Sequence, residues 1–326
     1  MAKKVLQIML VVFFFSTISP LCGISRGGEF PTRSIELIIP WAPGGPSDTM
    51  GRIVAPELGK ILGQPVVPVN KPGASGALGA ALLAKAKPDG YTILIVSNSS
   101  LTVFPHFEKV AYDPLTDFTY LGKLYNQFPG LYVRIDAPWK TFEEFLDFAK
   151  KNPKKIKYGT WGQYCAAHIC MEAIAKEKSV EWVHVPFKGD GPCITALLGG
   201  HLDAAANTAG HTPYLRAGKI RGLTMLRNAR SLIFPEIPSL RDVGVKFESK
   251  GSTNLTAGMI APKGLPKEII KKYEKAFEEV TKSPKFLEVS QNIGLEPDFV
   301  RGDEFHKETE EGYKYVLDYV KKLGFK

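Results

Sequence analysis

Six short loops rich in glycine, proline and hydroxyl residues are the parts of this sequence that could do chemistry. Each follows a run of β-branched residues and precedes a segment with helical spacing. The amino terminus of a helix offers unpaired N–H groups and about half a positive charge, so such a loop can hold an anion without a lysine. In chain order the loops are "PWAPGG" (40–45), "NKPGASGALGA" (70–80), "VSNSS" (96–100), "YGTWGQYCAAH" (158–168), "VPFKGDGPC" (185–193) and "NTAGHTP" (207–213).

For any one loop the alternative is that its Gly-Gly or Pro-Gly pair only marks a turn, and that Asp48 only caps a helix. No single loop decides between these two interpretations. Six such loops would form a cleft together, because open α/β sheets bind ligands at the carboxyl ends of their strands. The sequence therefore predicts an anion-binding cleft.

Enzyme signatures are incomplete in this chain. The stretch "GASGA" (73–77) has Ala77 where a nucleophile elbow needs its second glycine, and no phosphate-loop or dinucleotide-binding glycine motif occurs. Cys165 and His168 could place a thiol and an imidazole on one helical face, although a packed cysteine beside a buried histidine is commoner in exported proteins. A zinc site of Cys165, His168 and Cys170 fails, because residues five apart on a helix point to different faces. We expect no catalytic set, metal or cofactor.

Three cysteines follow the amino-terminal segment, namely Cys165, Cys170 and Cys193. The first two are too far apart on one helix for a disulfide, whose Cα atoms lie within about 7 Å. A disulfide, if one forms, joins Cys193 to one of them. Cys165 is favoured, because it and Cys193 are both expected at helix starts that face the cleft.

Residues 1–28 have the pattern of a secretory signal peptide. Lys3 and Lys4 precede an almost uninterrupted apolar run at residues 5–18, which is short for a membrane span, and small residues follow. We expect an exported protein, cleaved between residues 23 and 28. Lipid attachment at Cys22 is not expected, because a leucine precedes it where the lipoprotein signal needs a small residue.

The charge pattern argues against nucleic-acid binding. Lys and Arg number 42 against 33 Asp and Glu, a net charge of +9, and removal of the three bases in residues 1–28 leaves 39 against 33, or +6. The remaining bases are dispersed or alternate with acids, as in "KEIIKKYEKAFEEVTK" (267–282), which is typical of a solvated helix face. We expect no nucleic-acid partner.

The elements that must position the loops alternate in type along the chain. Such alternation predicts an α/β fold with mainly parallel sheets. Apolar residues recur at helical spacing from Met50 to Leu62, and Ser47 or Asp48 is placed to cap the start of that helix. The expected strands are "IELII", "PVVPV", "YTILIV", "KIKYG", "VEWVHV", "LDAAAN" and "RGLTML".

A second unit is expected to begin after residues 121–135 and to run to about residue 250. Its helix at "TFEEFLDFAKK" (141–151) starts with a capping box from Thr141 to Glu144. The strand "TNLTAGMIAP" (253–262) and three helices, starting near Pro266, Pro284 and Gly302, follow. The last helix has no strand beside it in sequence, so we expect it to return to the first unit.

Several of these motifs resemble the substrate-binding proteins of tripartite tricarboxylate transporters, the TctC or Bug receptors. The opening stretch is similar to the family's first-strand signature at residues 30–48, including Pro43-Gly44-Gly45 and Asp48. Further matches, in the family's order almost to the carboxyl terminus, are "VPVNKPGASGALGA", "KPDGYTIL", "VHVPFKGDGPCITALLGGHLD", "LRAGKIRGLTML", "FPEIPSLRDVG" and "GMIAPKGLPKEII".

The resemblance implies a type II periplasmic binding protein, a Venus-flytrap clamshell of two α/β lobes joined by a two-strand hinge. Lobe 1 would comprise residues 29–126 and 251–326, and lobe 2 residues 127–250. The protein would be a periplasmic monomer that delivers a small organic carboxylate to integral membrane transporter subunits. Two alternatives remain at this point: an exported cysteine-dependent hydrolase, and a receptor that passes its signal to a sensor protein.

The resemblance also implies which residues grip the ligand carboxylate, partly through ordered water. Lobe 1 would supply Trp41, Ala42, Gly44, Gly45, Asp48, Ser75, Gly76, Ser97 and Ser99. Lobe 2 would supply Thr160, Gly162, Cys165, His168, Lys188, Gly189, Asn207 and Thr208. Three positions depart from the family's usual pattern: Tyr164 replaces a glycine, Cys165 a hydroxyl donor and Asn207 a frequent aspartate. These departures predict a ligand whose distal group is less polar than that of citrate.

Overall fold

The computed structural model describes residues 29–231, 233–246 and 255–323, and the chain divides into residues 1–30 and residues 31–326. All the described strands and helices lie in residues 31–326. The predicted signal peptide at residues 1–28, with Cys22, lies outside the described residues. None of the helices described is long and apolar enough to cross a membrane.

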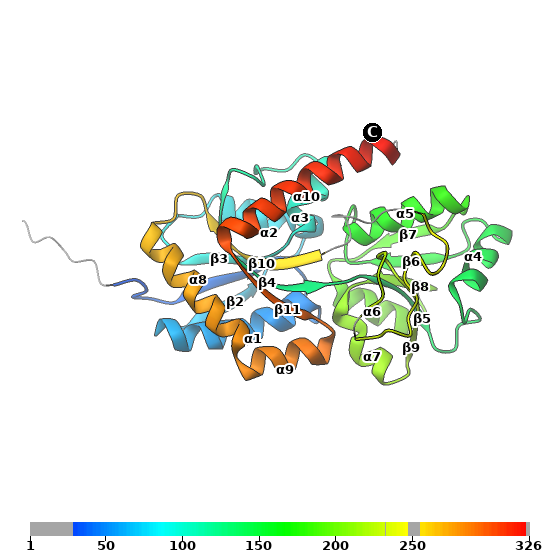
Figure 1. Ribbon diagram of the computed structural model, residues 1–326, viewed down its shortest axis with the longest axis horizontal. Coiled ribbons are helices and arrows are strands. Elements are labelled where there is room, and N and C mark those ends of the chain that lie inside the picture. Colours follow the sequence, from blue (N-terminus) through cyan, green and yellow to red (C-terminus); the bar gives the residue numbers. More distant parts are fainter. Residues whose placement is uncertain (1–28, 232, 247–254, 324–326) are drawn as a thin grey trace, which may run out of the picture. The chain divides into compact units, whose positions relative to one another are not determined.

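Two separate sheets organise residues 31–326 (Figure 1). One has six strands in the order β11-β4-β10-β3-β1-β2, and the other has five in the order β7-β6-β8-β5-β9. The six-stranded sheet is built from β1 (Ile35–Ile39), β2 (Val66–Asn70), β3 (Thr92–Ser97), β4 (Phe118–Gln127), β10 (Leu255–Pro262) and β11 (Glu296–Arg301). The five-stranded sheet is built from β5 (Gly130–Arg134), β6 (Lys157–Thr160), β7 (Val183–Pro186), β8 (Ala204–Asn207) and β9 (Ile220–Met225).

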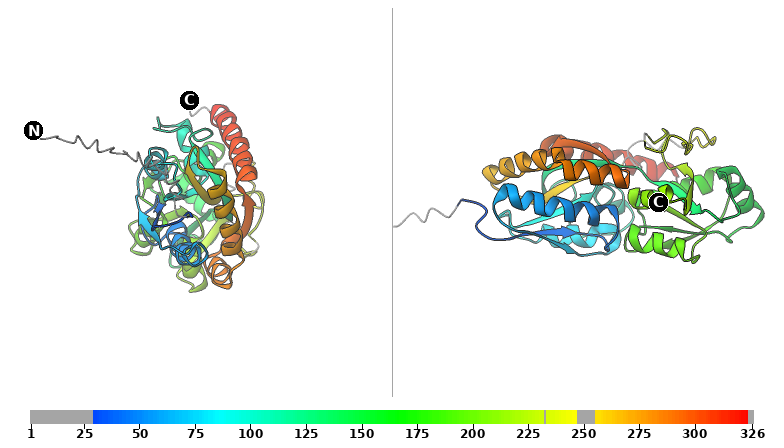
Figure 2. Two further views of the ribbon diagram at one scale, coloured as in Figure 1. Left: turned by 90° about the vertical axis from the view of Figure 1, so that its left-hand side faces the viewer. Right: turned by 90° about the horizontal axis from the view of Figure 1, so that it is seen from below.

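Helices accompany both sheets. The first sheet carries α1 (Pro46–Leu62), α2 (Ala77–Ala84), α3 (Ser99–Thr102), α8 (Lys267–Lys282), α9 (Pro284–Ile293), α10 (Gly302–Leu323) and the short turns η1 (Ala74–Gly76) and η2 (Phe104–His106). The second carries α4 (Phe142–Lys151), α5 (Ala166–Lys178), α6 (Asp190–Leu198), α7 (Thr212–Arg216) and η3 (Ala209–His211). Helices α1, α8 and α9 contact one another and lie together in Figure 2 (right; blue and orange).

The prediction of mainly parallel sheets is wrong, because both sheets are mixed. Parallel pairs join β1 to β2 and β3, and β6 to β7 and β8, whereas β10 and β5 pair antiparallel with each of their neighbours. The cause is the chain path. A strand that arrives from the other sheet, as β5 and β10 do, enters at the edge where β8 and β3 end, so it runs against them.

The expected elements otherwise form, and packing explains their positions. Every residue of β1 except Glu36 is buried, as in a strand covered on both faces. Gly51 lets α1 lie close to this strand, since a Cβ there would be 2.8 Å from Ile39 Cδ1. Half of the capping box at α4 forms, with Thr141 Oγ1 accepting from the Glu144 N–H (3.2 Å), whereas Glu144 Oε2 accepts from the Lys140 N–H (2.6 Å). The last helix, α10, returns to the first sheet and contacts β4 and α3, as expected.

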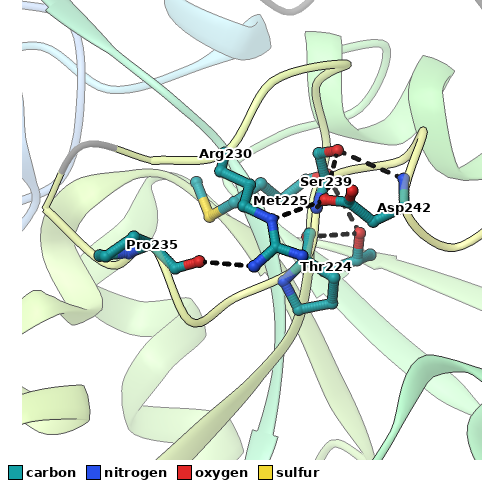
Figure 3. Close-up of polar contacts among 7 residues, drawn as sticks. Thr224, Met225, Arg230, Pro235, Ser239 and Asp242 are labelled. Atoms are coloured by element: carbon teal, nitrogen blue, oxygen red, sulfur yellow. Dashed lines mark hydrogen bonds and ion pairs between the residues drawn. The ribbon is translucent and has the colours of Figure 1, made fainter.

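A polar network fixes the segment after β9 (Figure 3). The Arg230 guanidinium donates to Asp242 Oδ2 (2.9 Å) and to the Pro235 carbonyl (2.9 Å). Asp242 also accepts from the Ser239 amide (2.9 Å) and hydroxyl (2.8 Å). The amide of Met225, at the end of β9, donates to the Pro238 carbonyl (2.7 Å), so the network is tied to the five-stranded sheet.

Candidate functional site

The loop between β1 and α1 is held by a buried carboxylate. Asp48 Oδ2 accepts from the Gly44 N–H (3.1 Å), and Oδ1 accepts from Asn70 Nδ2 (2.8 Å) and Arg52 Nε (3.0 Å). Burial opposes ionisation of Asp48, but these hydrogen bonds outweigh it and hold the pKa below its usual value. Asn70 Nδ2 donates as well to the Trp41 carbonyl (2.9 Å). Asp48 therefore braces the loop from behind.

The predicted cap of α1 is wrong. Gly45 is the N-cap, with φ −92° and ψ 173°, and Pro46 is the first helical residue, so Ser47 and Asp48 lie inside the first turn. Proline is favoured at that position, because its missing N–H would have no partner there and its φ already suits the helix. Asp48 instead bonds back to Gly44, one residue before the cap.

The second loop places a serine against the other sheet. Ser75 adopts φ +49° and ψ 36°, a left-handed conformation that is uncommon outside glycine. Its hydroxyl donates to the Gln163 carbonyl, and its own carbonyl accepts from Ser100 Oγ (2.8 Å). Gly76 also has a positive φ of +90°, and a Cβ there would be 2.9 Å from the Trp41 ring. Gly76 thus leaves room for Trp41.

Backbone groups of the two sheets' loops meet at a seam. The Ala42 N–H donates to the Lys188 carbonyl (2.8 Å). Gly189 has φ +141°, and a Cβ on it would lie 3.2 Å from Ala42 N. A Cβ on Gly191 would overlap the Pro43 carbonyl oxygen. The loops approach this closely because glycine stands at the points of contact.

A small cavity of about 10 Å³ lies at the seam, room for about one water molecule. Both sheets contribute to it. The first supplies Trp41, Gly45, Pro46, Ser47, Ser97 and Gln127, and the second supplies Trp161, Asp190 and Thr208. A metabolite would need the two sides to move apart.

The structure brings most of the predicted residues to this region. Four line the cavity: Trp41, Gly45, Ser97 and Thr208. Five form the seam or its backbone contacts: Ala42, Gly44, Ser75, Gly162 and Gly189. The Lys188 side chain is exposed, while its carbonyl accepts a hydrogen bond at the seam. The remaining seven are buried behind the lining, namely Asp48, Gly76, Ser99, Thr160, Cys165, His168 and Asn207.

Thr160, Cys165 and His168 form a buried group in which the side chains are neutral near pH 7. Burial raises the pKa of the Cys165 thiol to about 12 and lowers that of His168 to about 4. His168 Nδ1 accepts from the Tyr164 N–H (3.0 Å), and its ring stacks on His184 at 3.8 Å. A thiolate nucleophile is therefore not formed here, since the thiolate is the reactive species.

None of the three departures from the family pattern lines the cavity. Tyr164 has φ +52°, the conformation that a glycine would favour, and its ring stacks on Phe107 across the seam with centroids 4.8 Å apart. Cys165 is fully buried. Asn207, next to Thr208, is also fully buried, and neither of its side-chain amide atoms has a hydrogen-bond partner among the described residues. The less polar ligand predicted from these departures stays a prediction.

The favoured disulfide between Cys165 and Cys193 is not present. Cys165, Cys170 and Cys193 are all buried free thiols. Cys165 is the N-cap of α5 and Cys193 lies in the first turn of α6, as expected for helix starts. Each thiol instead packs in the interior without forming a disulfide.

Sequence reasoning missed five lining residues, namely Pro46, Ser47, Gln127, Trp161 and Asp190. Ser47, Trp161 and Asp190 lie in, or close after, loops that the sequence analysis identified. Their position near the end of a strand is the signal that could have identified them as lining residues. Asp190 is the clearest case, because an acid at the first position of a helix after a strand is common and usually exposed. Here it is only 9% exposed.

Comparison with known proteins gives one consistent result. A family model described as tripartite tricarboxylate transporter family receptor matches residues 50–324. The "UPF0065 protein in gbd 5′ region" of Cupriavidus necator is 34% identical over 300 residues, 92% of this chain and 90% of that one. The solved periplasmic binding protein BugD is 30% identical, with a TM-score of 0.84 over 90% of this chain and 99% of that one. MatC of Rhodopseudomonas palustris, solved with bound malate, is 26% identical, with a TM-score of 0.81 over 89% and 100%.

Proposed function

This chain belongs to the tripartite tricarboxylate transporter receptor family, and from that premise we propose that it binds a small organic carboxylate between its two sheets. It then delivers the ligand to integral membrane subunits of a transporter. MatC was solved with bound malate, which supports a carboxylate as the ligand of the present chain as well.

The observation that carries the proposal is the polar lining shared by the two sheets. Ser47 and Ser97 from the first and Thr208 from the second present hydroxyl groups, and Gln127 adds an amide. Hydroxyl and amide donors at strand ends and helix starts are suited to a carboxylate. Because they come from both sides, the ligand touches its full set of donors only when the sides are together. Binding therefore shifts the population toward the closed form, which the membrane partner recognises.

The proposal extends to location and organisation. Residues 1–28 direct export to the periplasm and are removed, Cys22 carries no lipid, and the receptor acts as a monomer. Lobe 1 comprises residues 29–126 and 251–326, and lobe 2 residues 127–250. The strands of the six-stranded sheet lie at Ile35–Gln127 and Leu255–Arg301, and those of the five-stranded sheet at Gly130–Met225, which supports these boundaries.

A receptor rather than an enzyme is the better account of the Cys165 and His168 pair. With the thiol pKa raised to about 12, few thiolates exist at neutral pH. His168, with its pKa lowered to about 4, accepts a backbone hydrogen bond instead of activating the thiol. These two residues support packing around the ligand site.

The test is a binding panel of small mono-, di- and tricarboxylates, with and without amino substituents, each paired with its methyl ester. Trp41 and Trp161 line the cavity, so tryptophan fluorescence should report binding. We expect at least one free acid to bind with a Kd of about 10 μM or below, while its ester binds at least tenfold more weakly. The proposal is wrong if no acid binds, or if esters bind equally well.

Two variants show where the ligand sits. Ser97→Ala and Thr208→Ala each remove one donor, on opposite sides of the cavity, and should weaken binding about tenfold. Thr116→Ala, at an exposed position, is the matched control and should leave the Kd unchanged.

A further inference from the structure

Asp190 is a buried acid that lines the cavity. It is 9% exposed and is the first residue of α6. Its Oδ1 accepts from the Thr208 N–H at 2.9 Å. Within the ranges that the structure describes, no Lys, Arg or His nitrogen lies within 4.0 Å of this carboxylate.

Asp190 lies close to the opposite side of the seam. A Cβ built on Gly45 would lie 3.8 Å from Oδ2 and 3.5 Å from Asp190 Cβ. Gly45 is the N-cap of α1, in the loop proposed to grip the ligand. The carboxylate therefore lies at the seam and lines the cavity, where a ligand held between the lobes would meet it.

The cavity lining carries a single formal charge, and that charge is negative. Among the nine lining residues Asp190 is the only Asp, Glu, Lys or Arg. Burial raises the pKa of its carboxyl to about 6, against hydrogen bonds from Thr208 that lower it. Above pH 7 the group is still mostly ionised. A ligand with carboxylates alone would bring a second negative charge next to it, in a place with little water to screen the repulsion.

Two indole rings accompany this carboxylate. Trp41 lines the cavity from the first sheet and Trp161 from the second, and both are less than 7% exposed. Aromatic faces attract ammonium groups, and tryptophan does so most strongly. A lining that combines one acid with two tryptophans is suited to a nitrogen cation.

We propose that the ligand carries a nitrogen cation in addition to its carboxylate, and that Asp190 pairs with this cation across the seam. The inference rests on the proposed function, which supplies the carboxylate. It narrows the ligand class to amino or quaternary-ammonium carboxylates. The ligand's own carboxylate is held by the hydroxyl and amide donors of the lining, and Asp190 is the specificity-determining residue.

Isothermal titration at pH 7.5 with near-isosteric pairs tests the inference. Glycine betaine is compared with 3,3-dimethylbutyrate, aspartate with methylsuccinate, and every acid that binds in the wider panel with its amino-substituted counterpart. The nitrogen-bearing member should bind at least tenfold more tightly in each pair that binds. An acid without nitrogen that binds as tightly as its counterpart overturns the inference and leaves the proposed function standing. If no carboxylate of either kind binds, the proposed function itself fails.

Substitution of Asp190 separates recognition from folding. Asp190→Asn should weaken the nitrogen-bearing ligand at least tenfold while leaving the plain acid unchanged or tighter, because the repulsion is removed. Asp190→Glu keeps the charge and should keep the order of preference. Asp203→Asn, which alters a carboxylate bonded to the Lys157 amide in the same sheet, is the control and should change neither affinity. Equal weakening of both ligands by Asp190→Asn would show a structural role only and would overturn the inference.

Discussion

Asp48 and Asp190 are both buried carboxylates in the first turn of a helix, yet their surroundings differ. Asp48 accepts hydrogen bonds from Gly44, Asn70 and Arg52, which keep it ionised and fix the loop. Asp190 accepts from one backbone amide and has the opposite shift in pKa. A satisfied carboxylate holds structure, and a buried one without a cation is available to a ligand.

Asp48→Asn should destabilise the folded protein by about 2 kcal/mol at pH 7, because hydrogen bonds to a charged group are lost at a buried position. The pKa of Asp48 is lowered on folding, so its contribution is present above its usual value of 3.8 and is lost as the pH falls through the folded value. The difference between wild type and variant should therefore shrink in acid. Urea unfolding at pH 7 and at pH 3 measures both effects.

The matched control for this prediction is Asp89→Asn. Asp89 pairs with Arg33 at 3.2 Å, but its side chain is 39% exposed and that of Arg33 is 61% exposed. An exposed ion pair contributes about 0–1 kcal/mol, so this variant should change stability little. A loss at Asp48 no larger than that at Asp89 would contradict the bracing role.

At the scale of elements, local sequence patterns predict those features of helices and strands that local interactions determine. The apolar run "IELII" forms the buried strand β1, and Thr141 caps α4 because its hydroxyl accepts from the amide of Glu144, three residues further on. Strand direction is different. Whether β10 runs with or against β3 depends on where the chain enters the sheet, and the residues of β10 do not encode that.

The candidate site also has features with a local cause and features that depend on distant parts of the chain. The loops at strand ends were predictable, because glycine and proline between a strand and a helix have a local cause. That Asp190 is buried, and that Trp161 and Gln127 line the cavity, depends on how closely the two sheets' loops approach. The close approach is set by contacts between segments about 90 to 150 residues apart, such as Ser75 with Gln163 and Ala42 with Lys188, and no local pattern reports it.

The close approach of α1 and α6 gives a prediction about Gly191. A methyl group there would overlap the Pro43 carbonyl oxygen when the loops touch. Gly191 is not among the glycines with a positive φ, so alanine is compatible with its backbone. Gly191→Ala should therefore leave the melting temperature of the ligand-free protein within about 2 °C and weaken ligand binding at least tenfold, because it opposes closure rather than folding.

Gly312→Ala on α10 is the control for that variant. A Cβ at Gly312 would make ordinary contacts, 3.4 Å from Thr102 Cγ2, and none with the loops that meet at the seam. Binding should be unchanged in this variant. If Gly191→Ala binds as tightly as wild type, the seam observed here is not the arrangement of the ligand-bound form.

At the scale of residues 31–326, the seam sets the balance between open and closed forms. A cavity of about 10 Å³ is too small for any organic acid, so ligand entry requires the two sides to separate. Direct contacts between the two sides oppose that separation, among them the bond from Ala42 to Lys188, the bond from Ser75 to Gln163 and the Tyr164 and Phe107 stack. The Arg216 guanidinium also donates to the Gln291 and Asn292 carbonyls (3.1 Å each). Opening must break contacts of this kind, and a bound ligand adds the contacts that keep the seam shut.

The Ala42 amide is a direct reporter of this equilibrium, because its acceptor, the Lys188 carbonyl, lies across the seam at 2.8 Å. Opening breaks that hydrogen bond without unfolding either sheet. Amide hydrogen exchange followed by NMR should show fast exchange at Ala42 in the ligand-free protein, and at least tenfold slower exchange with saturating ligand. The Ile35 amide, bonded to the Pro65 carbonyl at 2.9 Å inside the first lobe, should change little. Equal slowing at both amides would indicate general stabilisation, and no slowing at Ala42 would show that the ligand does not close the seam.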